Sequence, residues 1–303
     1  MKFGVNTLNF GVGTTPESLL QQAVDARELG YSFAMISDHI AVTPDVHETY
    51  PAPFYDQFAL AAHIAGRVPG LVLGTTVTVI PYRHPLQTAR LAANIDNLNA
   101  DGFILGAGIG WSRAEYEALG VPFAERGRIT DEYLAAIRAA WTEDPTTFRG
   151  EHVSYQGVRT APAPASAPCL PVWVGGNSAA AQRRAARLGE GWHPYRLPLD
   201  AIRAGLPVIT EEAERVRRPA PALVPRLQIR VTDALLGSER PAGHGTIDRI
   251  RADLAELGEL GATHVLLDVN PDTPAERRTA GDDRRLLELL VNKVVDPVTG
   301  GVR

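Results

Sequence analysis

The chain is poor in cysteine, in lysine and in long apolar runs. Its 303 residues include a single cysteine, Cys169, so no intrachain disulfide can form. Lysine occurs only at Lys2 and Lys293, and arginine supplies the remaining positive charge. No apolar run approaches the roughly 20 residues that a membrane-spanning helix needs. The amino terminus, MKFGVNTLNF, lacks the apolar core of a signal peptide. We therefore expect a cytoplasmic protein.

The charge balance is slightly acidic. The formal net charge is −5 at pH 7, which gives no electrostatic basis for binding nucleic acid or an anionic membrane surface. Hydrophobic residues make up 45% and charged residues 21% of the chain, as in ordinary globular proteins. The expected partner is a small-molecule substrate.

Short apolar runs alternate with longer amphipathic segments along the chain. The first helix shows the local signals well: Thr15, Pro16 and Glu17 give a capping hydroxyl, a proline at the first position and an acid in the first turn, and Gly30 ends the helix. The predicted strands cover residues 3–6, 33–37, 71–80, 103–108, 171–176, 190–194, 226–231 and 263–269. The predicted helices cover residues 15–30, 56–66, 85–98, 128–141, 178–188, 199–217, 246–260 and 283–292.

Eight strand-then-helix units predict a parallel sheet covered by helices, and eight is the number that closes a (β/α)₈ barrel. A doubly wound sheet is the competing fold, but GVNTLNFGVG after the first strand does not match the Gly-x-Gly-x-x-Gly turn typical of it. We therefore predict an α/β fold, a TIM (β/α)₈ barrel with inserted segments.

Two segments interrupt the alternation. TTFRGEHVSYQG (146–157) has the pattern of a hairpin, and APAPASAP (161–168) is a connector too short to be a domain linker. We predict a single domain over residues 1–303, with an insertion around 144–168 and a loose C-terminal tail at 293–303.

In such a barrel the active site lies at the C-terminal ends of the strands. The second predicted strand ends in AMISDHI, which places Asp38 and His39 there. A histidine can exchange a proton near neutral pH, and a neighbouring carboxylate can orient a ligand. The eight histidines lie at positions 39, 47, 63, 84, 152, 193, 244 and 264 and show no metal-ligand spacing, so we predict no metal site.

Two glycine-rich turns follow the fourth and fifth predicted strands, GAGIG (106–110) and GGNS (175–178). Backbone N–H groups in such turns, and the helix that Asn177 and Ser178 would open, suit the phosphate of a cofactor lying across both strands. Trp111 and Trp192 also follow glycine at strand ends, where they would either wall a flat ligand or pack in the core. No Gly-x-Ser-x-Gly turn supports nucleophilic catalysis.

Six stretches, taken in order over residues 1–270, carry a family resemblance. They are MKFGVNTLNFG, ARELGYSFAMISDH, LVLGTTVTVIPYRHP, LGAGIGWSRAEYEALGVPFAERG, LPVWVGGNSAAAQRRAARLGEGWHP and TIDRIRADLAELGELGATHVLLDV. Together they resemble the luciferase-like monooxygenase superfamily, and within it the coenzyme F420 (deazaflavin)-dependent oxidoreductases typical of actinobacteria.

The resemblance implies an enzyme that transfers a hydride between F420 and an organic substrate. His39 would be the catalytic proton donor or acceptor. Relatives carry a non-prolyl cis peptide at the position of Thr76-Val77 and are commonly homodimers. The implied cofactor-binding residues are Asn6, Asp38, His39, Thr76, Val77, Ala107, Gly108, Ile109, Gly110, Gly175, Gly176, Asn177 and Ser178.

The substrate is expected to be apolar or aromatic. Sugar-phosphate dehydrogenases of the superfamily carry a glutamate where this chain has Trp111, and the sequence offers no basic cluster for a substrate phosphate. Trp111 and Trp192 are the predicted walls of the substrate pocket. Three alternatives stay open: an FMN-dependent monooxygenase that uses reduced flavin and O₂, a non-catalytic flavin-binding protein, and a metal-dependent barrel hydrolase.

Overall fold

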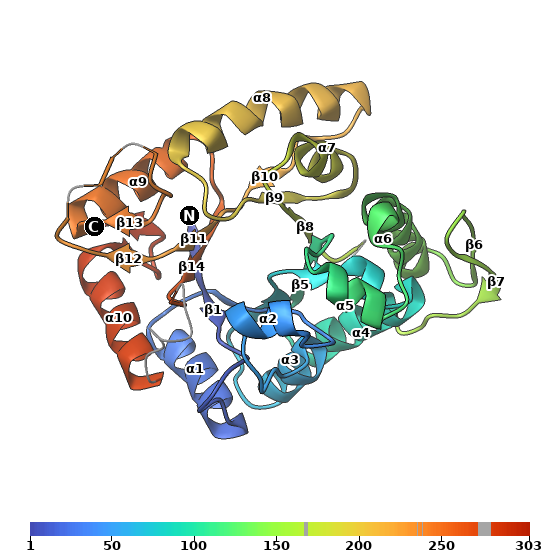
Figure 1. Cartoon of the computed structure of the whole chain (residues 1–303), viewed down its shortest axis with the longest axis horizontal. Helices are drawn as coiled ribbons and strands as arrows, with labels where there is room; N and C mark the ends of the chain where they lie inside the picture. Colours follow the sequence, from blue (N-terminus) through green and yellow to red (C-terminus); the bar gives the residue numbers. More distant parts are fainter. Residues whose placement is uncertain (167–168, 235, 238, 272–279) are drawn as a thin grey trace.

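Parallel strands form a ring that is surrounded by helices (Figure 1). The structure is a computed structural model and describes residues 1–166, 169–234, 236–237, 239–271 and 280–303. Within these ranges, the eight strand–helix units are β1 (Lys2–Thr7) with α1 (Pro16–Glu28), β2 (Phe33–Ile36) with α3 (Gln57–Ala65), β3 (Val72–Thr75) with α4 (Pro85–Leu98), β5 (Phe103–Gly108) with α6 (Arg126–Thr142), β8 (Val172–Gly175) with α7 (Ala179–Leu188), β9 (Gly191–His193) with α8 (Leu199–Arg215), β10 (Ala222–Leu223) and β11 (Arg226–Gln228) with α9 (Ile247–Glu259), and β14 (His264–Asp268) with α10 (Ala280–Lys293).

The ring closes through the segment that carries β10 and β11. β10 pairs in parallel with β9, while β11 pairs in parallel with β14, which in turn pairs with β1. Pro225 separates the two short strands and has no N–H to donate, so the seventh strand is broken there. The predicted (β/α)₈ barrel is confirmed, although its seventh strand begins earlier than the predicted residue 226.

Alternation along the strands separates an inner and an outer apolar layer. In β2, Ala34 and Ile36 join the large cluster under the helices, whereas Phe33 and Met35 join a small cluster with Trp173 inside the ring. This inner cluster fills the N-terminal half of the barrel. Polar side chains replace it towards the C-terminal ends of the strands, among them the buried Asn6 of β1 and Asp268 of β14.

A hairpin outside the ring forms the predicted insertion. β6 (Thr146–Arg149) and β7 (Ser154–Val158) pair antiparallel, as the alternating sequence predicts. The Glu132 carboxylate on α6 accepts the N–H groups of Glu151, His152 and Val153 at 2.8–2.9 Å, so one side chain docks the tip of the hairpin.

Short elements that the sequence did not predict lie in the loops. They are α2 (Pro44–Thr49), η1 (Ile80–Tyr82), α5 (Arg113–Ala118), η2 (Phe123–Glu125) and β13 (His244–Gly245). β4 (Thr78–Val79) and β12 (Arg230–Val231) lie within the predicted strands 71–80 and 226–231, which the structure divides into shorter pieces. Within the described ranges, none of the helices combines the length and the apolar character that crossing a membrane requires.

The expectation of a loose C-terminal tail was wrong. β15 (Val295–Asp296) and β16 (Gly301–Val302) form an antiparallel hairpin instead. Val295 is fully buried, and the Asp296 carboxylate accepts N–H groups within the turn. The amino group of Met1 donates to the carbonyl oxygen of Gly300 at 2.9 Å. An apolar anchor and a self-capped turn therefore order this segment.

Candidate functional site

A cavity of about 460 Å³ opens at the C-terminal ends of the strands. Eleven of the predicted site residues line it: Asp38, His39, Thr76, Val77, Gly108, Ile109, Gly110, Trp111, Gly175, Gly176 and Asn177. The lining also includes residues that the sequence did not single out, namely Ser37, Tyr50, Val79, His193, Tyr195 and Arg226. The predicted residues Asn6, Ala107, Ser178 and Trp192 do not line it. The structure thus gathers most of the predicted site around one space.

His39 lies in a box of aromatic rings. Its ring centroid is 5.3 Å from that of Tyr50, 5.4 Å from that of Phe54 and 5.9 Å from that of Trp111. The His39 side chain is only 7% exposed, whereas Trp111 is 49% exposed. Trp111 therefore stands at the mouth of the cavity, and His39 is the more buried of the two.

Glu115 of α5 is the partner of His39. Its Oε2 is 2.6 Å from His39 Nδ1 and accepts the Tyr82 hydroxyl at 2.9 Å, while Oε1 accepts the N–H groups of Ile40 and Ala41 at 2.7 and 3.0 Å. Burial raises the pKa of Glu115, but the hydrogen bond and charge of His39 and these two N–H groups outweigh it. The pKa of Glu115 therefore lies below its ordinary value, and the group is a carboxylate.

Asp38 is engaged by Arg83. The guanidinium donates to both carboxylate oxygens, at 2.7 and 2.9 Å, and the Val79 N–H donates to Oδ2 at 3.0 Å. Arg83 also donates to Asp56 at the start of α3. The Asp38 side chain thus connects the ends of β2 and β4 beneath the cavity, in addition to lining it.

Val77 lies against the glycine turns. The peptide bond between Thr76 and Val77 is cis, as the resemblance implied. A Cβ on Gly108 would lie 2.4 Å from Val77 Cγ2, and one on Gly175 would lie 3.0 Å from Val77 Cγ1, so neither position has room for a side chain. Gly176 has a φ of +120°, which only glycine adopts readily. These glycines and Val77 form a flat cradle on one side of the cavity.

The helix after the second glycine turn begins at the cavity. Ser178 caps α7, because its hydroxyl accepts the N–H of Ala181. Asn177, next to it, lines the cavity, and its amide group is paired with the backbone of Tyr195. A helix amino terminus at this point suits an anionic group of a ligand.

The prediction that Trp192 walls the substrate pocket was wrong. Trp192 is fully buried, and its indole N–H donates to the carbonyl oxygen of Gly176 at 2.9 Å. Gly205 of α8 makes room for the ring, since a Cβ there would lie 2.6 Å from Trp192 Cη2. Trp192 is a core residue between the barrel and α8.

A polar network forms the inner end of the cavity. Arg226 donates to Asp268 at 2.7 Å and to the carbonyl oxygen of Thr76 at 3.0 Å. Asn6 donates to the other oxygen of Asp268, so it supports this pair from below rather than lining the cavity. His193 contacts the Thr76 hydroxyl at 3.0 Å. Burial, helped by the charge of Arg226, lowers the pKa of His193 to about 4, so its ring is neutral at neutral pH.

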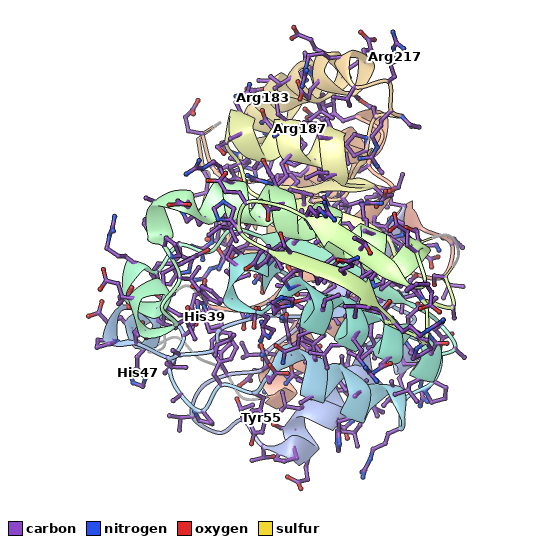
Figure 2. The ribbon with its side chains drawn as sticks, turned by 90° about the vertical axis from the view of Figure 1, so that its right-hand side faces the viewer. His39, His47, Tyr55, Arg183, Arg187 and Arg217 are labelled. Carbon is purple, nitrogen blue, oxygen red and sulfur yellow. The ribbon has the colours of Figure 1, made fainter. Side chains whose placement is uncertain are left out.

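The arginine that lines the cavity and the arginine behind Asp38 are each paired with a carboxylate. Arg226 is paired with Asp268, and Arg83 is paired with Asp38 and Asp56. The arginines Arg183 and Arg187 of α7 lie well apart from His39 (Figure 2). Among the described residues that line the cavity, none provides an unpaired positive charge.

Sequence reasoning missed Glu115, although a signal for it exists. Ser112 to Glu115 has the Ser-x-x-Glu spacing of a capping box, and the Ser112 hydroxyl does accept the Glu115 N–H. The glutamate, however, turns away from the cap towards residues 39–41. Only the fold reveals that partner.

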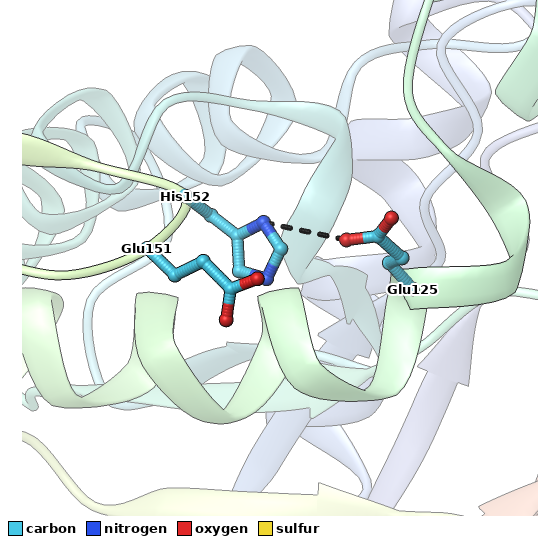
Figure 3. Close-up of side chains that lie close together, drawn as sticks. All are labelled: Glu125, Glu151 and His152. Carbon is cyan, nitrogen blue, oxygen red and sulfur yellow. Dashed lines mark ion pairs between the residues drawn. The ribbon is translucent and has the colours of Figure 1, made fainter.

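One cluster of possible metal ligands lies elsewhere. Glu125, Glu151 and His152 approach one another, with His152 Nδ1 3.7 Å from a Glu125 oxygen (Figure 3). Arg128 contacts both carboxylates, at 3.4 and 3.9 Å. The guanidinium already supplies the positive charge that the two acids attract, and none of the three residues lines the cavity.

Comparisons with known proteins reveal similar sequences and a similar fold. A family model described as luciferase-like monooxygenase matches residues 1–235. An uncharacterized protein of Mycobacterium tuberculosis is 33% identical over 203 residues, which are 62% of this chain and 69% of that protein. An F420-dependent glucose-6-phosphate dehydrogenase of Intrasporangium calvum is 31% identical over 183 residues, 58% of this chain and 53% of that enzyme. The crystal structure of monooxygenase RslO1 from Streptomyces bottropensis superposes with a TM-score of 0.78 at 19% identity, covering 97% of this chain and 98% of that one.

Proposed function

The chain belongs to the luciferase-like monooxygenase family and is an oxidoreductase, and on that premise we propose that it uses coenzyme F420 to transfer a hydride to or from a small apolar or aromatic substrate. The observation that carries this proposal is the cavity itself, which is lined both by His39 and by the cradle of Val77 and its glycines. A proton-exchanging side chain and a surface for a planar ring in one cavity are what such a reaction needs.

The cavity offers space and backbone donors for such a cofactor. Its volume of about 460 Å³ lies in the range of ligand pockets. The turns at Gly108–Gly110 and Gly175–Asn177, together with the start of α7, would hold the phosphate-bearing part, and Val77 would support the ring. When bound, a deazaflavin supplies or accepts a hydride through the carbon that replaces the flavin N5.

The protein contributes position and a proton. Reducing a carbonyl group consumes one hydride and one proton, and oxidising an alcohol releases the same pair. His39 is the side chain in the aromatic box that can give or take that proton. The rings of Tyr50, Phe54 and Trp111 exclude water from it and hold the substrate near the cofactor.

The lining also supports the substrate class. Trp111 offers a half-exposed aromatic face at the mouth. Arg226, which lines the cavity, is neutralised by Asp268, so a phosphate group on a substrate would find no unpaired cation among the described lining residues. An apolar ketone, enone or imine suits these walls better than a sugar phosphate.

The second candidate is an FMN-dependent monooxygenase, because the oxygenating constituent of 3,6-diketocamphane monooxygenase from Pseudomonas putida, solved in complex with FMN, shares the fold with a TM-score of 0.73 at 14% identity, covering 97% of each chain. Fluorescence titration of the purified protein with F420 and with FMN separates the two proposals. We expect tighter binding of F420, and no oxygen consumption beyond the autoxidation of free reduced FMN when reduced FMN is supplied. Binding of FMN alone would overturn the proposal.

A pair of glycine variants locates the binding site in the same titration. Gly108→Ala places a methyl group against Val77 and should weaken F420 binding about tenfold or more, a loss of about 1.4 kcal/mol. Gly66→Ala is the matched control: a Cβ at Gly66, at the end of α3, meets no atom closer than 3.8 Å. Equal loss of affinity in both variants would show that the cradle is not the binding surface.

A further inference from the structure

The side chain of Glu115 satisfies four donors at once. His39 and Tyr82 share Oε2, and the N–H groups of Ile40 and Ala41 share Oε1. The side chain is fully buried. Burial also raises the pKa of Tyr82, so this hydroxyl keeps its proton and donates it. A buried carboxylate with four donors is held in a single orientation.

This arrangement decides which nitrogen of His39 carries a proton. A carboxylate is an acceptor only, so the hydrogen bond at 2.6 Å requires a proton on Nδ1. Nε2 makes no hydrogen bond with the described residues, and the imidazole lines the cavity. The proton that a substrate gives or takes is therefore exchanged at Nε2.

We propose that Glu115 is the positioning residue of the site: it fixes the Nδ1 proton of His39 and so presents Nε2 to the substrate. This inference rests on the proposed function. In carbonyl reduction the imidazolium form of His39, protonated on both nitrogens, would give its Nε2 proton to the substrate oxygen and keep the Nδ1 proton, while the carbonyl carbon would receive the hydride that a bound deazaflavin supplies. In alcohol oxidation both transfers reverse, and the Nε2 lone pair receives the hydroxyl proton.

The backbone N–H groups that bind Glu115 determine how the amide of Glu115→Gln would be oriented. The N–H groups of Ile40 and Ala41 need an oxygen at the Oε1 position, which places the new amide nitrogen against His39. That nitrogen donates to Nδ1, so the neutral ring must carry its proton on Nε2. The tautomer is reversed while the size of the side chain is kept.

Long-range ¹H–¹⁵N spectra of the histidine-labelled, cofactor-free protein at about pH 9 report the tautomer of neutral rings. The His39 signals are those lost in His39→Gln. We expect a protonated Nδ1 in the wild type and a protonated Nε2 in Glu115→Gln. Glu117→Gln, on the exposed side of the same helix, is the matched control and should keep the wild-type tautomer.

Turnover gives the second readout. Glu115→Gln should lower kcat by about 10²–10⁴-fold, the range for losing general acid–base catalysis, and leave the Kd for F420 within about twofold. A wild-type His39 with its neutral proton on Nε2 overturns the proposal even if Glu115→Gln does not fold. Unchanged kcat in a variant with a reversed tautomer also overturns it.

The two proposals fail in different ways. If neither the wild type nor Glu117→Gln turned over or bound F420, the proposed function would be wrong. The spectra would still decide whether Glu115 sets the tautomer of His39, because they are recorded without cofactor.

Discussion

His39 is the residue whose loss separates chemistry from binding. In His39→Gln the amide N–H still reaches towards Glu115, which limits damage to the buried pair. We expect kcat to fall by about 10²–10⁴-fold, because the variant has no group that exchanges a proton near neutral pH. Stopped-flow turnover and fluorescence titration with F420 measure the two quantities separately. The Kd for F420 should change by less than about threefold.

A histidine outside the cavity supplies the control for that measurement. His47 lies exposed on α2 (Figure 2), and His47→Gln should leave both kcat and Kd unchanged. Full turnover by His39→Gln would remove His39 from the mechanism.

At the scale of single residues, the sequence predicted the lining residues whose position follows from a local sequence pattern. Asp38, His39 and the glycine turns come directly after apolar strands, so the barrel alone places them at the cavity. Glu115 lies 76 residues from His39, and no local pattern joins them. Trp192 was misplaced because a tryptophan at a strand end can face either the cavity or a helix, and the room made by Gly205 decided it.

At the scale of elements, the hairpin of β6 and β7 depends on one side chain of α6. In Glu132→Ala the N–H groups of Glu151, His152 and Val153 lose their acceptor. We expect the amides of residues 150–153 to exchange with solvent at least about tenfold faster, since a lost hydrogen bond is worth about 1 kcal/mol. Hydrogen exchange followed by mass spectrometry measures this locally.

The matched control is Glu143→Ala, which removes an exposed acid just after α6. It should leave the exchange of the hairpin tip unchanged. Equal protection in Glu132→Ala and the wild type would mean that strand pairing alone holds the hairpin. Turnover should not change in either variant, because the hairpin does not line the cavity.

Long helices and strands were predictable because their apolar residues recur at a regular spacing. α4 begins and ends at the predicted residues 85 and 98, and β5 at the predicted 103 and 108. The helices α2 and α5 have six residues each, too few to show an apolar repeat. The C-terminal hairpin escaped prediction because its strands have two residues each and depend on contacts with distant parts of the chain.

At the scale of the whole molecule, stability should fall in mild acid. The pKa of His193 is lowered to about 4, chiefly by burial, while the unfolded chain has a value of about 6.5. Between these values the unfolded state binds a proton that the folded state does not. The free energy of unfolding therefore rises with pH across this window, by up to about 1.4 kcal/mol per pH unit for this group.

Urea unfolding of the wild type and of His193→Gln at several pH values between 4.5 and 7.5 tests this expectation. The variant should show a weaker pH dependence, and His47→Gln should behave like the wild type. The free energy of unfolding of His193→Gln should still depend on pH to some extent, because burial also lowers the pKa of His264 to about 4. Identical pH profiles for the wild type and His193→Gln would contradict the assignment.

The barrel itself could be predicted by counting eight strand–helix units, but its seam could not. The apolar run 226–231 marks the seventh strand, whereas the ring closes through both β10 and β11 around Pro225. That closure depends on the pairing of β10 with β9 and of β11 with β14, and these pairs form only when the whole ring assembles. Arg226, the first residue after Pro225, lines the cavity, and its place there likewise depends on how the ring closes.

The pairing of β1 with β14 also bears on how the protein is made. His39, Tyr82 and Glu115 all lie within the first 115 residues, so the ribosome releases the proton-exchanging half of the site early. Gly175, His193 and Arg226 follow much later, and β1 remains without its β14 partner until Asp268 has emerged. A ligand that needs the complete cavity could therefore bind only once translation of the barrel is nearly complete, and the nascent chain must protect an unpaired β1 edge until then.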